Sequence, residues 1–330
     1  MNRRQYLASL SVLGTGALAG CLDDLSGLRD ASSVGTQREP TVEMTRSYRE
    51  ADRDRRRAVG QLNRAALALR PLATELEDTG NVSVEFDEPR DRLADARTHL
   101  EDAEATDEGT AAAVAALRSF ADVLAGVVET TAAVTDDAIP DAIDALSEEI
   151  DARRLEAAET TVAGLRARFA TARDELDPAL ETLPELDRDR LEGLAVVDLE
   201  PIEEGLRLLD EVVVGLSNLG AALAATVDGH RCLERGEEQT EAERYDEAAA
   251  SFDEAAAHYE AATAHSDDAL DAPGGVGTYA ETTRCQSVHL EEAALEFADS
   301  ARALDERDPT GAARHEEAGA AALEAADDCV

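Results

Sequence analysis

The chain has 330 residues, of which 31 are basic and 73 acidic, and its formal net charge is −42 at pH 7. The basic residues are all arginine, aromatic residues make up 3%, and tryptophan is absent. A charge this negative argues against nucleic-acid binding, which needs a basic surface, and a hydrophobic content of 44% argues against a disordered polyacid.

The N-terminus has the layout of a targeting segment. Arg3 and Arg4 precede a run of 14 uncharged residues, from Tyr6 to Ala19. This run is shorter than the roughly 20 apolar residues that span a bilayer as a helix, and it ends in small residues, as signal-peptide cores do. A short buried helix is the alternative, but it would show polar positions at helical spacing.

Two motifs in this segment resemble those of exported lipoproteins. Arg3-Arg4-Gln5-Tyr6-Leu7 resembles a twin-arginine export signal, with Tyr6 where Phe is usual, and the lipobox is matched by Leu18, Ala19, Gly20 and Cys21. The resemblance implies that residues 1–20 are removed, that Cys21 carries a lipid, and that the chain folds before export. It places the protein on the outer face of the cytoplasmic membrane, bound to membrane lipid through Cys21.

The composition also resembles that of haloarchaeal extracellular proteins, whose acidic surfaces stay hydrated in brine. Near 1 M salt the Debye length is about 3 Å, so most of the self-repulsion of such a surface is screened. Residues 21–40 show no sustained periodicity and are interpreted as a lipid-anchored tether that spans roughly 25 Å as a flexible coil.

Beyond Pro40 the apolar residues recur at close to heptad spacing, which predicts helices nearly throughout. The phase of the stripe changes once, between Ile150 and Leu155, and only residues 81–86 (NVSVEF) resemble a strand. We therefore expect an all-α fold of long, heptad-patterned antiparallel helices in two bundle-like groups. The expected helices cover about 48–76, 93–103, 114–128, 143–176, 202–227, 245–262, 290–304 and a short segment from Pro309.

Three prolines, Pro178, Pro184 and Pro201, mark the expected boundary between the two groups, because proline interrupts helices. The sequence thus predicts an N-terminal helical bundle over 41–183, a proline-bounded joint over 184–198 and a C-terminal helical bundle over 199–330. A further loop is expected at 272–277 (APGGVG) from its glycines and proline.

The C-terminal bundle contains a weak tetratricopeptide-like hairpin at about 229–262. The resemblance rests on the spacing of Gly236, Tyr245, Ala248, Phe252 and Ala255. It implies two helices that cross at a small residue, with an aromatic side chain filling the gap. One such unit does not make a solenoid groove, which needs about three, so an ordinary helical hairpin remains the alternative.

Three cysteines remain after Cys21, and an exported protein can keep a disulfide. If the last two helices form an antiparallel hairpin that turns near Asp308, Cys285 and Cys329 lie at nearly the same level. This register predicts a Cys285–Cys329 disulfide and a free Cys232. The alternative, Cys232–Cys285, requires the helix before Cys232 to end near Gly229.

No catalytic or cofactor motif is evident. The only candidate metal ligands at helical spacing are Glu254, His258 and His265, and we expect these histidines to be ordinary surface residues, with no metal and no cofactor. Residues 38–70 hold nine arginines and five acids. These arginines are expected either to pair with acidic helices of the bundle or to contact anionic lipid headgroups.

The sequence favours a non-enzymatic cell-surface lipoprotein that acts as a helical interaction or structural module with an unidentified protein partner. The alternative is a ligand- or metal-binding lipoprotein that delivers to a membrane transporter. That function would require a cleft with converging polar groups.

Overall fold

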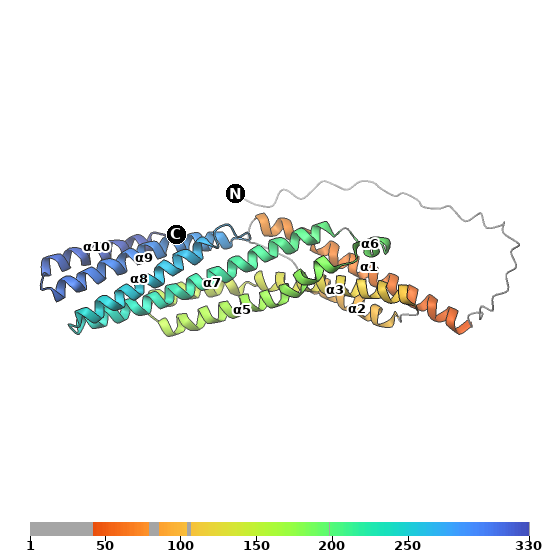
Figure 1. Cartoon of the computed structure of the whole chain (residues 1–330), viewed down its shortest axis with the longest axis horizontal. Coiled ribbons are helices and arrows are strands. Elements are labelled where there is room, and N and C mark those ends of the chain that lie inside the picture. Colours follow the sequence, from red (N-terminus) through yellow and green to blue (C-terminus); the bar gives the residue numbers. More distant parts are fainter. Residues whose placement is uncertain (1–41, 79–85, 104–106, 198, 330) are drawn as a thin grey trace, which may run out of the picture. The chain divides into compact units, whose positions relative to one another are not determined.

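The computed structural model describes residues 42–78, 86–103, 107–197 and 199–329, and within these ranges the chain is all-α, as predicted. The predicted tether and the strand-like residues 81–85 lie outside the described residues. The helices are α1 (Val42–Asp78), α2 (Asp87–Asp102), α3 (Glu108–Val134), α4 (Ala138–Asp151), α5 (Leu155–Thr182), the 3-10 helix η1 (Leu183–Glu185), α6 (Arg188–Gly193), α7 (Glu200–Glu241), α8 (Tyr245–Asp267), α9 (Val276–Asp305) and α10 (Pro309–Asp327) (Figure 1).

The helices before residue 183 bury large aliphatic side chains. Leu62 of α1, Leu100 of α2 and Leu117 of α3 are each fully buried in one shared cluster. These residues belong to the heptad stripes, so the spacing of apolar residues along the chain directly sets which helix faces meet.

Helix α7 connects the two halves of the sequence. Its 42 residues pack against α5 and, further along, against α8 (Figure 1). Leu206 and Val213 lie in the same apolar cluster as α1–α3, whereas Cys232 and Leu233 lie in a cluster with α8 and α9. Residues 42–330 therefore pack as one compact unit, and the apolar core continues past the proline-bounded joint.

Two of the prolines that mark the expected boundary differ in how they affect their helices. Pro201 lies in the first turn of α7, where a missing N–H costs nothing. Pro178 lies inside α5, which continues to Thr182. The buried Leu176 and Ala179 flank this proline, and their burial holds the last turn in place despite the lost hydrogen bond.

The phase change in the predicted helix at 143–176 is a chain reversal between α4 and α5. Arg153 has a φ of 54°, and its N–H donates to the carbonyl of Ile150 while the N–H of Arg154 donates to Glu149. These two bonds form a Schellman motif, which closes a helix end with a left-handed residue.

The same turn recurs twice in the C-terminal half. Glu243 (φ 56°) is the middle residue of the connection from α7 to α8, and Arg307 (φ 62°) is the middle residue of that from α9 to α10. In both, the residue that follows donates from its N–H to a carbonyl five residues earlier, Arg244 to Gln239 and Asp308 to Ala303. Each three-residue connection therefore produces an antiparallel helix pair.

Glycines bring the C-terminal helices close together. A Cβ placed on Gly236 of α7 would lie 2.5 Å from Phe252 Cε1 of α8, and one on Gly319 of α10 would lie 2.7 Å from Phe297 Cε1 of α9. The first contact is the small-residue and aromatic pairing that the hairpin at 229–262 was expected to contain. Helix α7 runs without a break through Gly229 to Glu241, so the first arm of this hairpin is the end of a longer helix and not a separate short one. The tetratricopeptide assignment itself stays a prediction.

Candidate functional site

The residues of the export and anchoring motifs lie outside the described part of the chain. They are Arg3, Arg4, Leu18, Ala19, Gly20 and Cys21. Their roles stay predictions.

Cys285 of α9 and Cys329, just after α10, form a disulfide with a Cα–Cα distance of 5.8 Å. This is the pair that the register of an antiparallel hairpin predicts. Cys232 is a free, buried thiol in the interior of α7. The alternative pairing required a helix end near Gly229, and α7 does not end there.

The candidate ligands Glu254, His258 and His265 do not all meet. Glu254 and His258 lie one turn apart on α8, and Cys232 of α7 faces them. The thiol sulfur, a carboxylate oxygen of Glu254 and a ring nitrogen of His258 lie within 4.8 Å of one another. His265, two turns further along α8, is not part of this group.

Arg235 and the protein interior determine the electrostatics of this cluster. The Nη1 atom of Arg235 donates to Oε2 of Glu254 at 2.9 Å, and its Nη2 atom lies 3.8 Å from the Cys232 sulfur. Burial raises the pKa of the Cys232 thiol, and the negative charge of Glu254 raises it further. Both effects disfavour the thiolate, which is the form that oxidants and alkylating agents attack.

Sequence reasoning missed Cys232 as a member of this group, although a signal for it exists. Cys232 and Glu254 each lie 11 residues from Glu243, the turn residue between α7 and α8. The register argument that pairs Cys285 with Cys329 therefore also places Cys232 opposite Glu254.

A second group of polar residues lies where α4, α7, α9 and α10 meet. A pocket of about 100 Å³ is lined there by His230, Thr226 and Gln286, among others. The His230 ring packs edge-on against Tyr259 with 5.6 Å between ring centroids. Burial lowers the pKa of His230 to about 4 and raises that of Tyr259, so both rings are neutral near pH 7.

The arginine-rich stretch of α1 makes its ion pairs within the helix. Arg55 and Arg56 both pair with Asp52, and Arg57 pairs with Asp54. The Asp54 carboxylate also lies 4.0 Å from Nδ1 of His99 on α2. Among the residues whose side chains are described, the ion pairs of the arginines themselves stay within α1. An open depression of about 510 Å³ on this surface is lined by Arg49, Asp52, Arg53, Arg56 and Arg57.

Two helical stretches, 108–151 and 200–241, are long and apolar enough to cross a membrane by length and composition alone. In each, 56% of the apolar window is buried inside the protein, as in the core helices of soluble proteins. Comparison of the chain with protein-family models, curated proteins and solved structures finds no match.

Proposed function

We propose that this chain is a non-enzymatic lipoprotein, held on the outer face of the cytoplasmic membrane through Cys21, that acts as a helical interaction or structural module. The observation that carries the proposal is the close packing of the described C-terminal helices. The C-terminal helices meet at alanines and at glycine–aromatic contacts, and the pocket between them measures about 100 Å³. Small-molecule sites usually enclose about 300–1,000 Å³, so this pocket is smaller than such a site, and we propose that the exposed helix faces carry the binding role.

The composition and the N-terminal motifs support the proposed location. The tether would end at α1, whose Arg49 and Arg53 are exposed and make no ion pair among the described residues. Arginines next to a lipid anchor favour contact with anionic headgroups. In molar salt this attraction acts only over about 3 Å, so it would assist the anchor and not replace it.

The anchor is tested by Cys21→Ser, because a hydroxyl is a poor substitute for the thiol in lipid attachment. We expect the variant to leave the membrane fraction or to keep its uncleaved signal. Cys329→Ser, which changes a cysteine far from the N-terminus, is the matched control and should remain membrane-bound. A Cys21→Ser protein that stays on membranes at its mature size would exclude the lipobox interpretation.

The interaction role is tested by affinity capture of the mature protein from membranes in molar salt, followed by mass spectrometry. We expect one defined protein at a near-stoichiometric level. Val288 and Leu295 are exposed apolar residues on α9, at 41% and 45%, and share a face at a spacing of two turns. Changing both to Asp should reduce recovery of the partner if this face contacts it, whereas Val214→Asp, at an apolar residue of α7 that is 44% exposed, should not. Recovery of no defined protein contradicts the proposal.

The alternative, a lipoprotein that delivers a ligand or metal to a transporter, is favoured by one observation, the cluster of Cys232, Glu254 and His258. A delivery protein must release its cargo. Rapid exchange of a captured ion with added chelator would support delivery, and retention of the ion would favour a structural role.

A further inference from the structure

The turn between α7 and α8 brings three potential metal ligands of different chemistry to one place. Glu254 and His258 are separated by four residues, so their side chains leave α8 on the same face. The antiparallel register about Glu243 places Cys232 of α7 at the level of Glu254. Two helices therefore supply a sulfur, an oxygen and a nitrogen ligand within 4.8 Å of one another.

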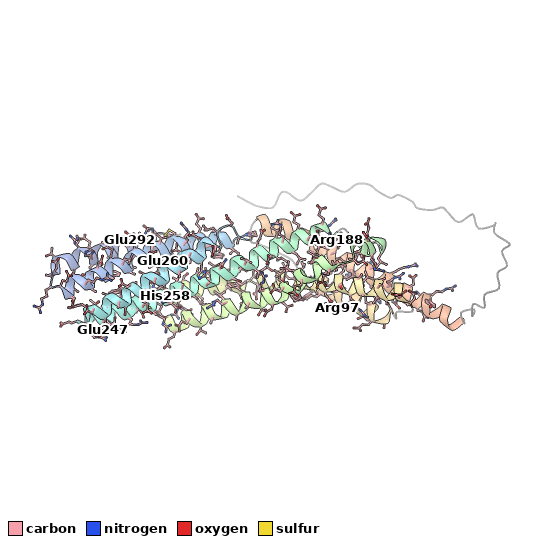
Figure 2. The ribbon with its side chains drawn as sticks, in the orientation of Figure 1. Arg97, Arg188, Glu247, His258, Glu260 and Glu292 are labelled. Carbon is pink, nitrogen blue, oxygen red and sulfur yellow. A yellow bond between two sulfur atoms is a disulfide. The ribbon has the colours of Figure 1, made fainter. Side chains whose placement is uncertain are left out.

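The separation of these atoms fits a four-coordinate ion after a small adjustment. Zinc lies about 2.3 Å from a thiolate sulfur and about 2.0–2.2 Å from imidazole or carboxylate atoms. Tetrahedral angles then put the ligand atoms about 3.3–3.6 Å apart. Glu254 is exposed and His258 half-buried, so rotation of these two side chains can bring them about 1 Å closer while Cys232 stays fixed in the core. Figure 2 labels His258 and Glu260, both of which lie on α8.

The charges around the cluster also suit a divalent cation. A Cys232 thiolate and the Glu254 carboxylate together carry two negative charges, which match the charge of a divalent cation, while Arg235 adds one positive charge 3.8 Å from the sulfur. The proton that Cys232 loses passes to solvent. Arg235 holds Oε2 of Glu254 and leaves the other carboxylate oxygen for the ion. Asp228, one turn before Cys232 on α7, carries a further negative charge, which Arg231 pairs with at 3.6 Å.

We propose that Cys232, Glu254 and His258 form a binding site for a zinc-like divalent cation that joins α7 to α8, with the fourth position taken by water. A mixed sulfur, nitrogen and oxygen ligand set selects zinc and similar ions over magnesium or calcium, which prefer oxygen alone. The inference does not depend on the proposed interaction role.

A second group, Cys285, His289 and Cys329, also brings its ligand atoms within 4.8 Å of one another. Both of its sulfurs belong to the disulfide, so neither is available as a thiolate in the oxidised protein. The two groups can therefore be separated by keeping the disulfide intact during the measurement.

The test is titration of the oxidised, full-length mature protein with Co²⁺ in molar salt, monitored by absorbance. Cobalt bound by a thiolate in a tetrahedral site gives a near-ultraviolet charge-transfer band and intense visible bands. Cobalt on surface carboxylates gives neither. We expect one equivalent per chain to produce these bands and Zn²⁺ to abolish them by displacement.

The variants identify the ligands. Cys232→Ser should remove the charge-transfer band. His258→Gln and Glu254→Gln should weaken cobalt binding at least tenfold, since even indirect partners of metal ligands contribute 10- to 100-fold. His265→Gln, on the same helix but outside the cluster, is the matched control and should bind as the unchanged protein does. Circular dichroism checks that each variant keeps its helices.

Absence of the charge-transfer band in the folded protein at one equivalent of Co²⁺ would overturn the proposal. So would an unchanged band in Cys232→Ser. His258→Gln, which alters a half-buried side chain, keeps the test decisive should Cys232→Ser fail to fold, because full-strength binding by His258→Gln also excludes the site.

Discussion

The helices before residue 183 and the helices α8–α10 reach the same architecture with different side chains. The first region buries large residues, Phe120 and many leucines among them. The cluster between α7, α8, α9 and α10 consists mainly of alanine, with Phe252 and Tyr259 as its largest members. Alanine buries little apolar area, and each buried methylene contributes only about 0.8 kcal/mol. The second region therefore depends more on close approach, tight turns and a covalent link.

The disulfide gives the largest expected difference between the two regions. Cys285 and Cys329 are 44 residues apart, and closing a loop of this length contributes about 3–4 kcal/mol by the chain-entropy model. We expect the double change Cys285→Ser/Cys329→Ser to lower protection from hydrogen exchange in α9 and α10 while α1–α3 keep theirs. Non-reducing peptide mapping provides the control: a Cys232–Cys285 crosslink, or three free thiols, would show that the pairing is wrong.

His230 gives the second region a sensitivity to pH. Its pKa is lowered by burial from 6.5 to about 4, so between these values the unfolded chain binds a proton that the folded chain does not. The free energy of unfolding then falls as pH decreases, by up to about 1.4 kcal/mol per unit. Above pH 6.5 the histidine is neutral in both states and has no such effect.

We expect His230→Gln to remove this slope. Chemical denaturation in molar salt gives the free energy of unfolding of the unchanged protein and of the variant. We expect the difference between these two free energies to change by up to about 3 kcal/mol between pH 7 and pH 4. The carboxylates titrate equally in both proteins and cancel. A constant difference across this range would mean that His230 is free to take up a proton in the folded state.

Changes at two glycines of α7 distinguish the effect of close helix packing on stability from the effect of helix propensity. Gly236→Ala puts a Cβ 2.5 Å from Phe252, so the aromatic ring must move, and overpacking of this kind costs about 1–3 kcal/mol. At Gly205 no described atom lies within 4 Å of an added Cβ, so Gly205→Ala should stabilise by about 0.5–1 kcal/mol. Thermal unfolding measures both. Equal effects at the two positions would mean that α7 and α8 are not in close contact.

The smallest effect concerns the turn between α9 and α10. Arg307 has a φ of 62°, which costs a side-chain-bearing residue about 1–2 kcal/mol. Arg307→Gly should relieve this strain and, after the greater flexibility of the unfolded chain is subtracted, stabilise by about 0.5–1 kcal/mol. Arg314→Gly, in the interior of α10, is the matched control and should destabilise by about 1 kcal/mol. Destabilisation by both changes would argue against the left-handed turn.

The candidate metal cluster shows how far reasoning from the sequence reaches. Helical spacing alone brings Glu254 and His258 together, because residues four apart share a face. The same spacing argument extended the group to His265, two turns on, which the structure does not include. The third ligand atom comes instead from Cys232 on α7, and finding it requires the position of the α7–α8 turn.

The sequence by itself determined the helices, their buried faces and, through the register of one hairpin, the Cys285–Cys329 disulfide. These follow from local periodicity and from the length of a turn. The tertiary structure decided how far α7 extends, that the chain reverses direction between residues 150 and 155, and which apolar cluster each part of α7 joins. Such features depend on contacts between residues distant in sequence: Pro178 stays helical because Leu176 and Ala179 are buried, and Arg153 turns the chain because two helices pack on either side of it.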